Sequence, residues 1–304
     1  MALNLNIFAF KTSNLTSHLA KLKSPACAAL CLAATLSVSL PVLADQAVNP
    51  ALKSVYMVKN VNIGDLPVKT IVPITAKTRL QAIAQAQVIA QNPDADLAEF
   101  RIDLLDFADD NIRVMALGHE LNRILEHKPL IATIRTANEG GQLKITDQAY
   151  EKIYSAYLQQ PFMQLLDIEM YRAPASVEKL TQLAHQNNVL VIMSNHDFNQ
   201  TPSQAEIEQR LYQQDQMGAD ILKIAVMPKR QQDVLTLMNA TANVRQNSNK
   251  PLLTMSMGQL GTISRVATAN IGGSLSFGMI GEASAPGQID VKQLKHILNV
   301  VQPN

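Results

Sequence analysis

The chain has 304 residues with 26 basic and 25 acidic side chains, which gives a formal net charge of +1. Residues 45–304 alone carry −2, because three lysines and no acidic residue precede them. This balance excludes the basic footprint of a nucleic-acid-binding protein. Both cysteines, Cys27 and Cys31, lie near the N-terminus, so the rest of the chain has no disulfide and no thiolate chemistry. It must be stabilised by core burial alone, and its length suits one large domain.

The first 44 residues have the pattern of a secretory signal. Three lysines precede the apolar, small-residue stretch 26–40, and a Val-Leu-Ala sequence ending at Ala44 follows it. We expect cleavage after Ala44, a periplasmic location, and a single catalytic domain over 45–304. An uncleaved membrane anchor is the alternative, but two serines and Pro41 make this stretch a poor spanning helix. We therefore expect no stable membrane insertion after cleavage.

Short apolar runs then recur along the chain, and each is followed by a segment long enough for one helix. The eight runs are 70–74, 97–102, 130–134, 165–168, 189–193, 221–226, 252–255 and 274–277. Alternating strands and helices imply a parallel sheet, and eight repeats predict an α/β fold of the (β/α)₈ TIM-barrel class. An open doubly wound sheet is the alternative.

Three local patterns refine this prediction. Residues 55–63 predict a small hairpin that closes the barrel floor. Ser203 and Glu206 have the spacing of a capping box, which predicts the start of a helix. In the final segment, Val291, Leu294 and Leu298 have helical spacing, so we expect the chain to end in a helix.

Lys223 is the most informative residue, because it lies inside the apolar run 221–226. A buried strand should be continuously hydrophobic, and desolvation of a lysine favours the neutral amine. A neutral amine attacks carbonyl groups and forms a Schiff base. The alternatives are a lysine that extends to solvent or one that is paired with a buried carboxylate.

Polar residues follow several of the predicted strands, at the end of the barrel where active sites lie. His196 follows the run next to that of Lys223, and histidine both accepts and donates a proton near neutral pH. Glu139 follows the run 130–134 and could orient the imidazole, the role of the third group in catalytic triads. We expect these residues to form the catalytic group.

The remaining polar residues suggest a site for a hydroxylated acid. Arg265 is expected near the start of the helix after 252–255, where a cation opposes the helix macrodipole unless an anion lies between them. With Ser284 and Gln288 it could hold a carboxylate. The other substrate-binding candidates are Glu99, Arg101 and Arg135, which could bind hydroxyl groups or pair with one another, and the expected pocket wall is Met255, Met257 and Phe277.

Several cofactor and metal motifs are missing from the sequence. His119-Glu120 begins like a zinc-protease helix, but position 123 is arginine rather than histidine. No glycine-rich nucleotide fingerprint follows the first strand, and no cluster has metal-ligand spacing. We therefore expect no cofactor and no metal.

Six motifs resemble those of the type I 3-dehydroquinate dehydratases, in the family's order and over residues 68–302. They are Glu99–Asp103, Arg135–Gly141, Ser194–Phe198, Lys223–Pro228, Thr254–Gly258 and Ser284–Gln288. The resemblance implies a dimeric barrel enzyme, a hydro-lyase that converts 3-dehydroquinate to 3-dehydroshikimate.

The same resemblance implies roles for the residues singled out above. Lys223 forms an imine with the ring ketone, His196 moves the proton, and Glu139 tunes His196. Arg265, Ser284 and Gln288 bind the carboxylate, and Glu99, Arg101 and Arg135 bind the hydroxyl side. The loop that carries Ser284 and Gln288 is a lid that excludes water.

Two features depart from the family pattern. Pro73 replaces a small polar residue that some members carry on the first strand. The export signal is unusual because biosynthetic members are cytosolic, and it favours a role in the breakdown of external quinate. Two other functions stay open: a class I aldolase of the same fold, and an exported, non-catalytic binding protein for a cyclic hydroxy acid.

Overall fold

A computed structural model describes residues 54–303. The predicted signal peptide, including Ala44, lies outside the described residues. The strands are β1 Tyr56–Val58, β2 Val61–Ile63, β3 Lys69–Ile74, β4 Leu97–Arg101, β5 Leu130–Thr133, β6 Leu165–Glu169, β7 Leu190–Asp197, β8 Ile221–Val226, β9 Leu252–Ser256, β10 Leu275–Met279 and β11 Ile289–Asp290. The α-helices are α1 Arg79–Gln91, α2 Asn111–Leu125, α3 Asp147–Gln159, α4 Pro174–Gln186, α5 Gln204–Gln216, α6 Gln231–Asn247, α7 Thr262–Val266 and α8 Val291–Val301.

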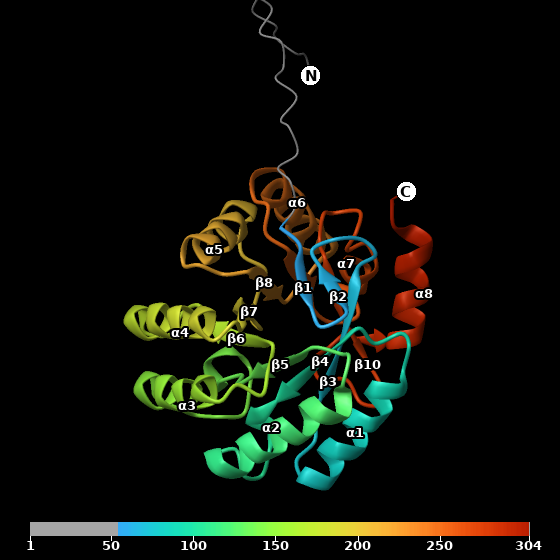
Figure 1. Cartoon of the computed structure of the whole chain (residues 1–304). Coiled ribbons are helices and arrows are strands. Elements are labelled where there is room, and N and C mark those ends of the chain that lie inside the picture. The colour runs from blue at the N-terminus through green and yellow to red at the C-terminus, as the bar shows by residue number, and fades with distance from the viewer. Residues whose placement is uncertain (1–53, 304) are drawn as a thin grey trace, which may run out of the picture. The chain divides into compact units, whose positions relative to one another are not determined.

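The main sheet is parallel and curls into a barrel surrounded by helices (Figure 1). Strands β3 to β9 pair in chain order, and β10 returns to pair with β3. At the seam between β9 and β10, the backbone N–H of Ser274 donates to the carbonyl of Leu252 at 2.8 Å. The last long strand thus lies beside both the first strand and β9, whereas an open doubly wound sheet has free edges. The TIM-barrel prediction is confirmed, and the open sheet is excluded.

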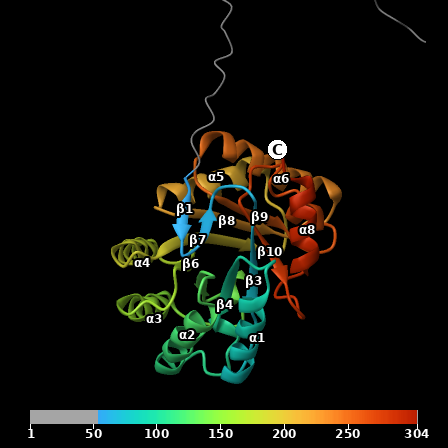
Figure 2. The same ribbon diagram turned by 45° about the vertical axis from the view of Figure 1, so that its right-hand side comes forward.

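Apolar side chains form two layers, one inside the barrel and one between the sheet and the helices. The inner layer includes Ile71, Leu97 and Ile131, one from each of three neighbouring strands. Val58 and Ile63 of the β1–β2 hairpin belong to the same buried cluster, so the hairpin closes one end of the barrel, as predicted (Figure 2).

One strand is longer than the sequence predicted. β7 continues to Asp197, and His196 pairs in register with Ala225 of β8. We expected residues 194–197 to follow the strand, because polar residues at the end of an apolar run usually mark a loop. Here Ser194 and Asn195 are buried and hydrogen-bonded to other side chains, so their polarity does not end the strand.

The predicted start of α5 is confirmed in part. Ser203 is the N-cap, and its hydroxyl accepts a hydrogen bond from the backbone N–H of Glu206. The carboxylate of Glu206 pairs with Arg210 one turn further on, instead of returning to the cap. No helix within residues 54–303 is both long enough and apolar enough to cross a membrane.

Candidate active site

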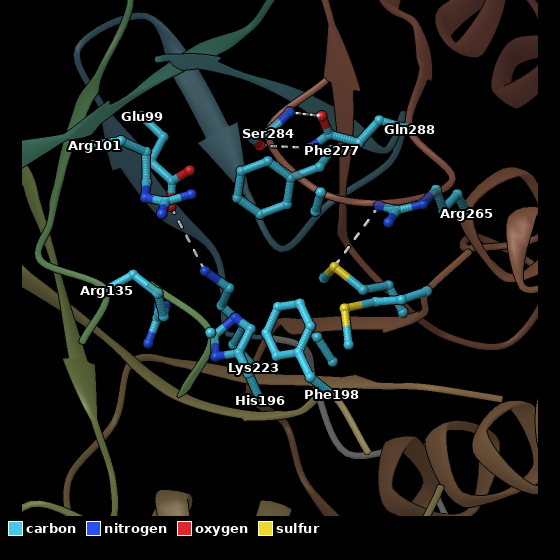
Figure 3. A pocket seen from close by; sticks show the side chains of 15 residues that line it. Glu99, Arg101, Arg135, His196, Phe198, Lys223, Arg265, Phe277, Ser284 and Gln288 are labelled. Carbon is cyan, nitrogen blue, oxygen red and sulfur yellow. Dashed lines mark hydrogen bonds and ion pairs between the residues drawn. The ribbon is translucent and has the colours of Figure 1, made fainter. Parts of the chain in front are cut away.

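A cavity at the C-terminal ends of the strands brings most of the predicted site residues together (Figure 3). The predicted residues that line it are Glu99, Arg101, Arg135, His196, Lys223, Met255, Met257, Arg265, Phe277, Ser284 and Gln288. Gly140, Phe198, Ala225 and Ala285 complete the lining. Glu139 lies behind His196 and lines an adjacent cavity instead.

Lys223 extends from β8 into this cavity, and its side chain is only 4% exposed. The ammonium donates to Oδ2 of Asp167 at 2.7 Å and lies 3.7 Å from Oε1 of Glu99. The ring of Phe277 lies 5.0 Å away and covers another side. We expected an uncharged amine in an apolar interior, but the structure has the alternative, a lysine paired with buried carboxylates. An ammonium group is not a nucleophile, so the ion-paired lysine must give up a proton before it attacks a carbonyl.

A buried glutamine fixes the backbone of Lys223. Gln214 of α5 accepts from the Lys223 N–H at 2.9 Å and donates to the Lys223 carbonyl at 2.9 Å. This reciprocal pair joins the helix to the strand and gives both backbone polar groups of Lys223 a partner. Gln214 was not among the predicted residues, although a glutamine on the buried face of an amphipathic helix is the signal that could have found it.

His196 and Glu139 form the predicted pair. Nδ1 of His196 lies 2.9 Å from Oε2 of Glu139, and the same oxygen accepts from the His196 backbone N–H at 3.0 Å. Asn195 Nδ2 and Arg135 donate to the carboxylate at 3.3 Å each. Because these other neighbours are donors, Glu139 best accepts the Nδ1 proton. The second ring nitrogen of His196 is then free to act as a base.

Burial sets the protonation of this pair. It lowers the pKa of His196 well below the usual range, and the charges of Arg135 and Lys223 add to this effect. The imidazole is therefore neutral near pH 7 and can accept a proton. Burial also raises the pKa of Glu139, to about 8, although Arg135 opposes the shift. The ionised form of Glu139, which orients the imidazole, therefore becomes more populated as the pH rises through about 8 and less populated as the pH falls.

Arg135 connects the two halves of the site. Its guanidinium contacts Asp167 at 2.6 Å, Glu169 at 3.0 Å and Glu139 at 3.3 Å, so it bridges the partner of Lys223 and the partner of His196. Burial opposes its ionisation, but these carboxylates outweigh burial and raise its pKa well above the usual range. Pairing with Arg135 was the alternative role for Glu99 and Arg101, but the acidic partners of Arg135 are Glu139 and the two acidic residues of β6.

Glu99 and Arg101 have other partners. Arg101 forms a two-point ion pair with Asp103, with both contacts at 2.8 Å. Oε1 of Glu99 accepts from the hydroxyl of Thr133 at 3.0 Å. Both side chains still line the cavity, so they remain available to a ligand.

Asp167 is the main site residue that the sequence analysis missed. It is fully buried on β6 and accepts from Lys223, Arg135 and the Ser194 hydroxyl. Burial opposes its ionisation, but the charges of Arg135 and Lys223 hold its pKa below the usual range. The signal was available, since an aspartate inside the apolar run 165–168 is as unusual as a lysine inside 221–226.

Arg265 is buried without an acidic partner among residues 54–303. It is the fourth residue of the five-residue helix α7 and so also lies in its last turn, where a cation does not oppose the macrodipole as predicted. One terminal nitrogen donates to the Pro286 carbonyl at 3.1 Å, the other lies 3.7 Å from the sulfur of Met255, and Nε has no partner. Burial lowers the pKa of Arg265 to about 10. An unpaired buried cation is costly, so its position on the cavity wall indicates a site for an anion.

The loop between β10 and β11 covers the cavity beside Arg265. Its Ser284 and Gln288 bond each other: the Ser284 N–H donates to Gln288 at 2.8 Å, and Gln288 donates to the Ser284 hydroxyl at 2.9 Å. The loop contacts the end of β9 where Gly258 donates to the Pro286 carbonyl. Gly287 has φ +78°, and a Cβ there would lie 2.2 Å from the Gly258 carbonyl oxygen. Only glycine allows this close approach.

The fold and the site together define a TIM-barrel enzyme with a buried lysine, a carboxylate-oriented histidine and a buried arginine without an acidic partner in the described chain, all around one cavity. The model of the type I 3-dehydroquinase family matches residues 70–304. The chain belongs to the type I 3-dehydroquinate dehydratase family. Within the described part of the chain, no group of three or more His, Cys, Asp or Glu side chains could hold a metal ion.

Individual relatives agree with this assignment. The catabolic 3-dehydroquinate dehydratase of Acinetobacter baylyi is 72% identical over 269 residues, which cover 87% of this chain and 99% of that protein. The crystal structure of the Clostridium difficile type I enzyme, with covalently modified comenic acid, has a TM-score of 0.79 at 35% identity and covers 82% of this chain and 98% of its own. The enzyme from Enterococcus faecalis has a TM-score of 0.77 at 37% identity, with coverages of 82% and 100%.

Proposed function

We propose that the chain removes water from 3-dehydroquinate to give 3-dehydroshikimate through an imine on Lys223. One observation carries the mechanism: the amine of Lys223 lies in the cavity against Asp167 and Glu99, with His196 and Arg265 on the same walls. Relatives named 3-dehydroquinate dehydratase support the reaction. The covalently modified ligand in the Clostridium difficile structure supports a covalent route.

The first step joins the lysine to the ring ketone. The ammonium passes a proton to a neighbouring carboxylate, and the free amine attacks the carbonyl carbon. Loss of water gives a protonated imine, so the ammonium and the ketone together yield an iminium and one water molecule. The nitrogen is positively charged both as the ammonium before the step and as the iminium after it. Asp167, 2.7 Å from the ammonium, neutralises this charge.

The second step uses His196 first as a base and then as an acid. The imidazole takes a proton from the carbon next to the imine carbon, and the electron pair moves to the iminium nitrogen. The pair then returns and expels the hydroxyl of the next carbon, which leaves as water with the proton from His196. Water finally hydrolyses the conjugated iminium, which frees the enone and restores the Lys223 ammonium.

The polar residues around the cavity are expected to bind the carboxylate and the hydroxyl groups of the substrate. We assign the carboxylate to Arg265, Ser284 and Gln288, because Arg265 has no acidic partner among residues 54–303. We assign the hydroxyl groups to Glu99, Arg101 and Arg135, which line the same cavity. Arg135 also positions Asp167 and Glu139 through its ion pairs with them.

Arg265→Gln is expected to lower kcat/KM through a higher KM. Loss of one partner of a buried charge pair costs about 2–5 kcal/mol, or roughly 30- to 4,000-fold. The free protein should not lose stability, because the variant removes a buried charge without an acidic partner. Steady-state kinetics and thermal melting check both points, with the exposed Arg230 changed to Gln as the control. An unchanged KM for Arg265→Gln contradicts the carboxylate assignment.

Two other functions fit parts of the site. A class I aldolase of this fold also needs a strand lysine, and an exported binding protein for a cyclic hydroxy acid would need the arginine. Neither explains a histidine with a free ring nitrogen beside the lysine. Borohydride reduction with 3-dehydroquinate separates the three: the dehydratase gives a trapped adduct and an ultraviolet-absorbing enone. An aldolase forms no enone, and a binding protein forms no adduct.

The N-terminal sequence motivates a further part of the proposal. A basic flank, an apolar stretch and a small-residue site at Ala44 support export to the periplasm, a single catalytic domain over 45–304 and a role in quinate breakdown. We also assign the mature chain as a homodimer. Purification from a periplasmic fraction, with N-terminal mass analysis and light scattering, tests all of this. Active enzyme in the cytosol that retains residues 1–44 contradicts export, and a monomer mass contradicts the dimer.

A further inference from the structure

A second cavity lies on the other side of the His196–Glu139 pair. Its volume is about 540 Å³, enough for several water molecules at about 30 Å³ each. Gly140, His196 and Phe198 line both cavities, but Glu139 lines only the second. Tyr171 also lines it and is 59% exposed, so the cavity reaches the surface away from the substrate. Glu139, whose carboxylate orients His196, therefore faces the second cavity and not the substrate cavity.

A chain of hydrogen bonds runs along the wall of this second cavity to the histidine. Arg210 of α5 donates to Oδ1 of Asn195 at 2.8 Å. Nδ2 of Asn195 donates to Oε1 of Glu139 at 3.3 Å. Oε2 of Glu139 lies 2.9 Å from Nδ1 of His196. Arg210 is therefore connected to the imidazole through two side chains, although it does not line the substrate cavity.

The arginine determines which way the amide of Asn195 faces. Arginine has only donors, so the amide oxygen must face Arg210 and the amide nitrogen must face Glu139. Arg210 is itself held by an ion pair with Glu206 one turn away and by the ring of Tyr171 at 5.8 Å. Its side chain is only 14% exposed, so packing and these contacts restrict where the guanidinium can lie. Without it, the amide could rotate and turn its oxygen towards the carboxylate, which would repel it.

We propose that Arg210 is a positioning residue for the catalytic base and acts through Asn195 and Glu139 from the wall of the second cavity. This inference rests on the proposed role of His196. The charged or titratable groups close to Glu139 are Arg135 after β5, Asp167 and Glu169 of β6, and His196 of β7, and the second cavity is also lined by Tyr171, Arg172, Asp197 and Arg210. Asn195 is the neighbour through which Arg210, from outside the substrate cavity, reaches Glu139.

Arg210→Met is the test, with Arg210→Lys as the conservative rescue. We expect kcat to fall about threefold to tenfold at pH 7 with KM unchanged, which is within the range of one ordinary intramolecular hydrogen bond. The acid limb of the kcat profile should move upward by about half a pH unit to one pH unit, since Glu139 loses a donor. Arg210→Lys should recover part of both effects, because its ammonium can still donate to Asn195. Arg230→Met, an exposed arginine outside both cavities, is the matched control.

A double variant tests the route. If Arg210 acts through Asn195, adding Arg210→Met to Asn195→Leu should cause no further loss. Borohydride trapping of wild-type protein with 3-dehydroquinate tests the proposed function separately, because imine formation does not need Arg210. A wild-type pH profile in a folded Arg210→Met variant, or additive losses in the double variant, overturns the inference and leaves the dehydratase mechanism intact. If Arg210→Met does not fold, the pH profiles of Arg210→Lys and Asn195→Leu are compared instead. A wild-type profile in Arg210→Lys together with a shifted profile in Asn195→Leu supports the inference. A wild-type profile in both variants overturns it.

Discussion

Lys223→Met is expected to lower turnover by at least about 10⁴-fold while the barrel stays folded. Within residues 54–303 no other lysine lines the substrate cavity, so no second amine of this part of the chain can form the imine. Methionine fills a similar volume without the charge, and Asp167 keeps Arg135 and Ser194 as partners. Lys223→Ala should lose turnover equally but leaves a cavity, which typically costs a few kcal/mol of unfolding free energy.

Intact mass after borohydride reduction with 3-dehydroquinate shows directly whether Lys223 forms the imine. Wild-type protein should gain one adduct, and peptide mapping should place it on Lys223. The control is Lys229→Met, which changes an exposed lysine in the loop after β8. Circular dichroism and thermal melting show whether each variant is folded. An adduct on Lys223→Met, or turnover near the wild-type rate, would overturn the imine mechanism.

The fold was predictable because hydrophobic runs and helix-length spacers repeat eight times. Each strand is buried on both faces, so its apolar run stands out from the polar segments around it. The end of the barrel that carries the active site could then be predicted from chain direction alone, since the C-terminal ends of all parallel strands lie at the same end. For this reason residues as far apart in sequence as Glu99 and Gln288 could be assigned to one cavity, and both line it.

The pairing of charges was not predictable, because it depends on angles and distances that sequence spacing does not fix. Lys223 was expected in an apolar interior, yet Oδ2 of Asp167 on β6 lies 2.7 Å from its amine. Pairing of Arg135 with Glu99 was an open alternative, but the guanidinium contacts Asp167 and Glu169 of β6 instead. Arg265 was placed at a helix start, while α7 is only five residues long and ends just after it. In each case the residue type indicated the site, and packing decided the partner.

His196→Ala is expected to form the imine but to turn over about 10²- to 10⁴-fold more slowly, the usual contribution of a general base. The amine and its carboxylates do not depend on the imidazole, so the Lys223 adduct should still appear on borohydride treatment. The proton on the carbon next to the imine would have no base, and substrate recovered from heavy water should contain less deuterium than with wild-type protein.

His127→Ala is the control, because His127 is exposed and outside both cavities. Rapid-quench measurement of the adduct and steady-state turnover together separate imine formation from proton transfer. Wild-type turnover in His196→Ala would exclude the histidine as the base. Loss of the adduct in a folded His196→Ala variant would instead place the histidine in the first step, where it would take the proton that Lys223 must lose before it attacks the ketone.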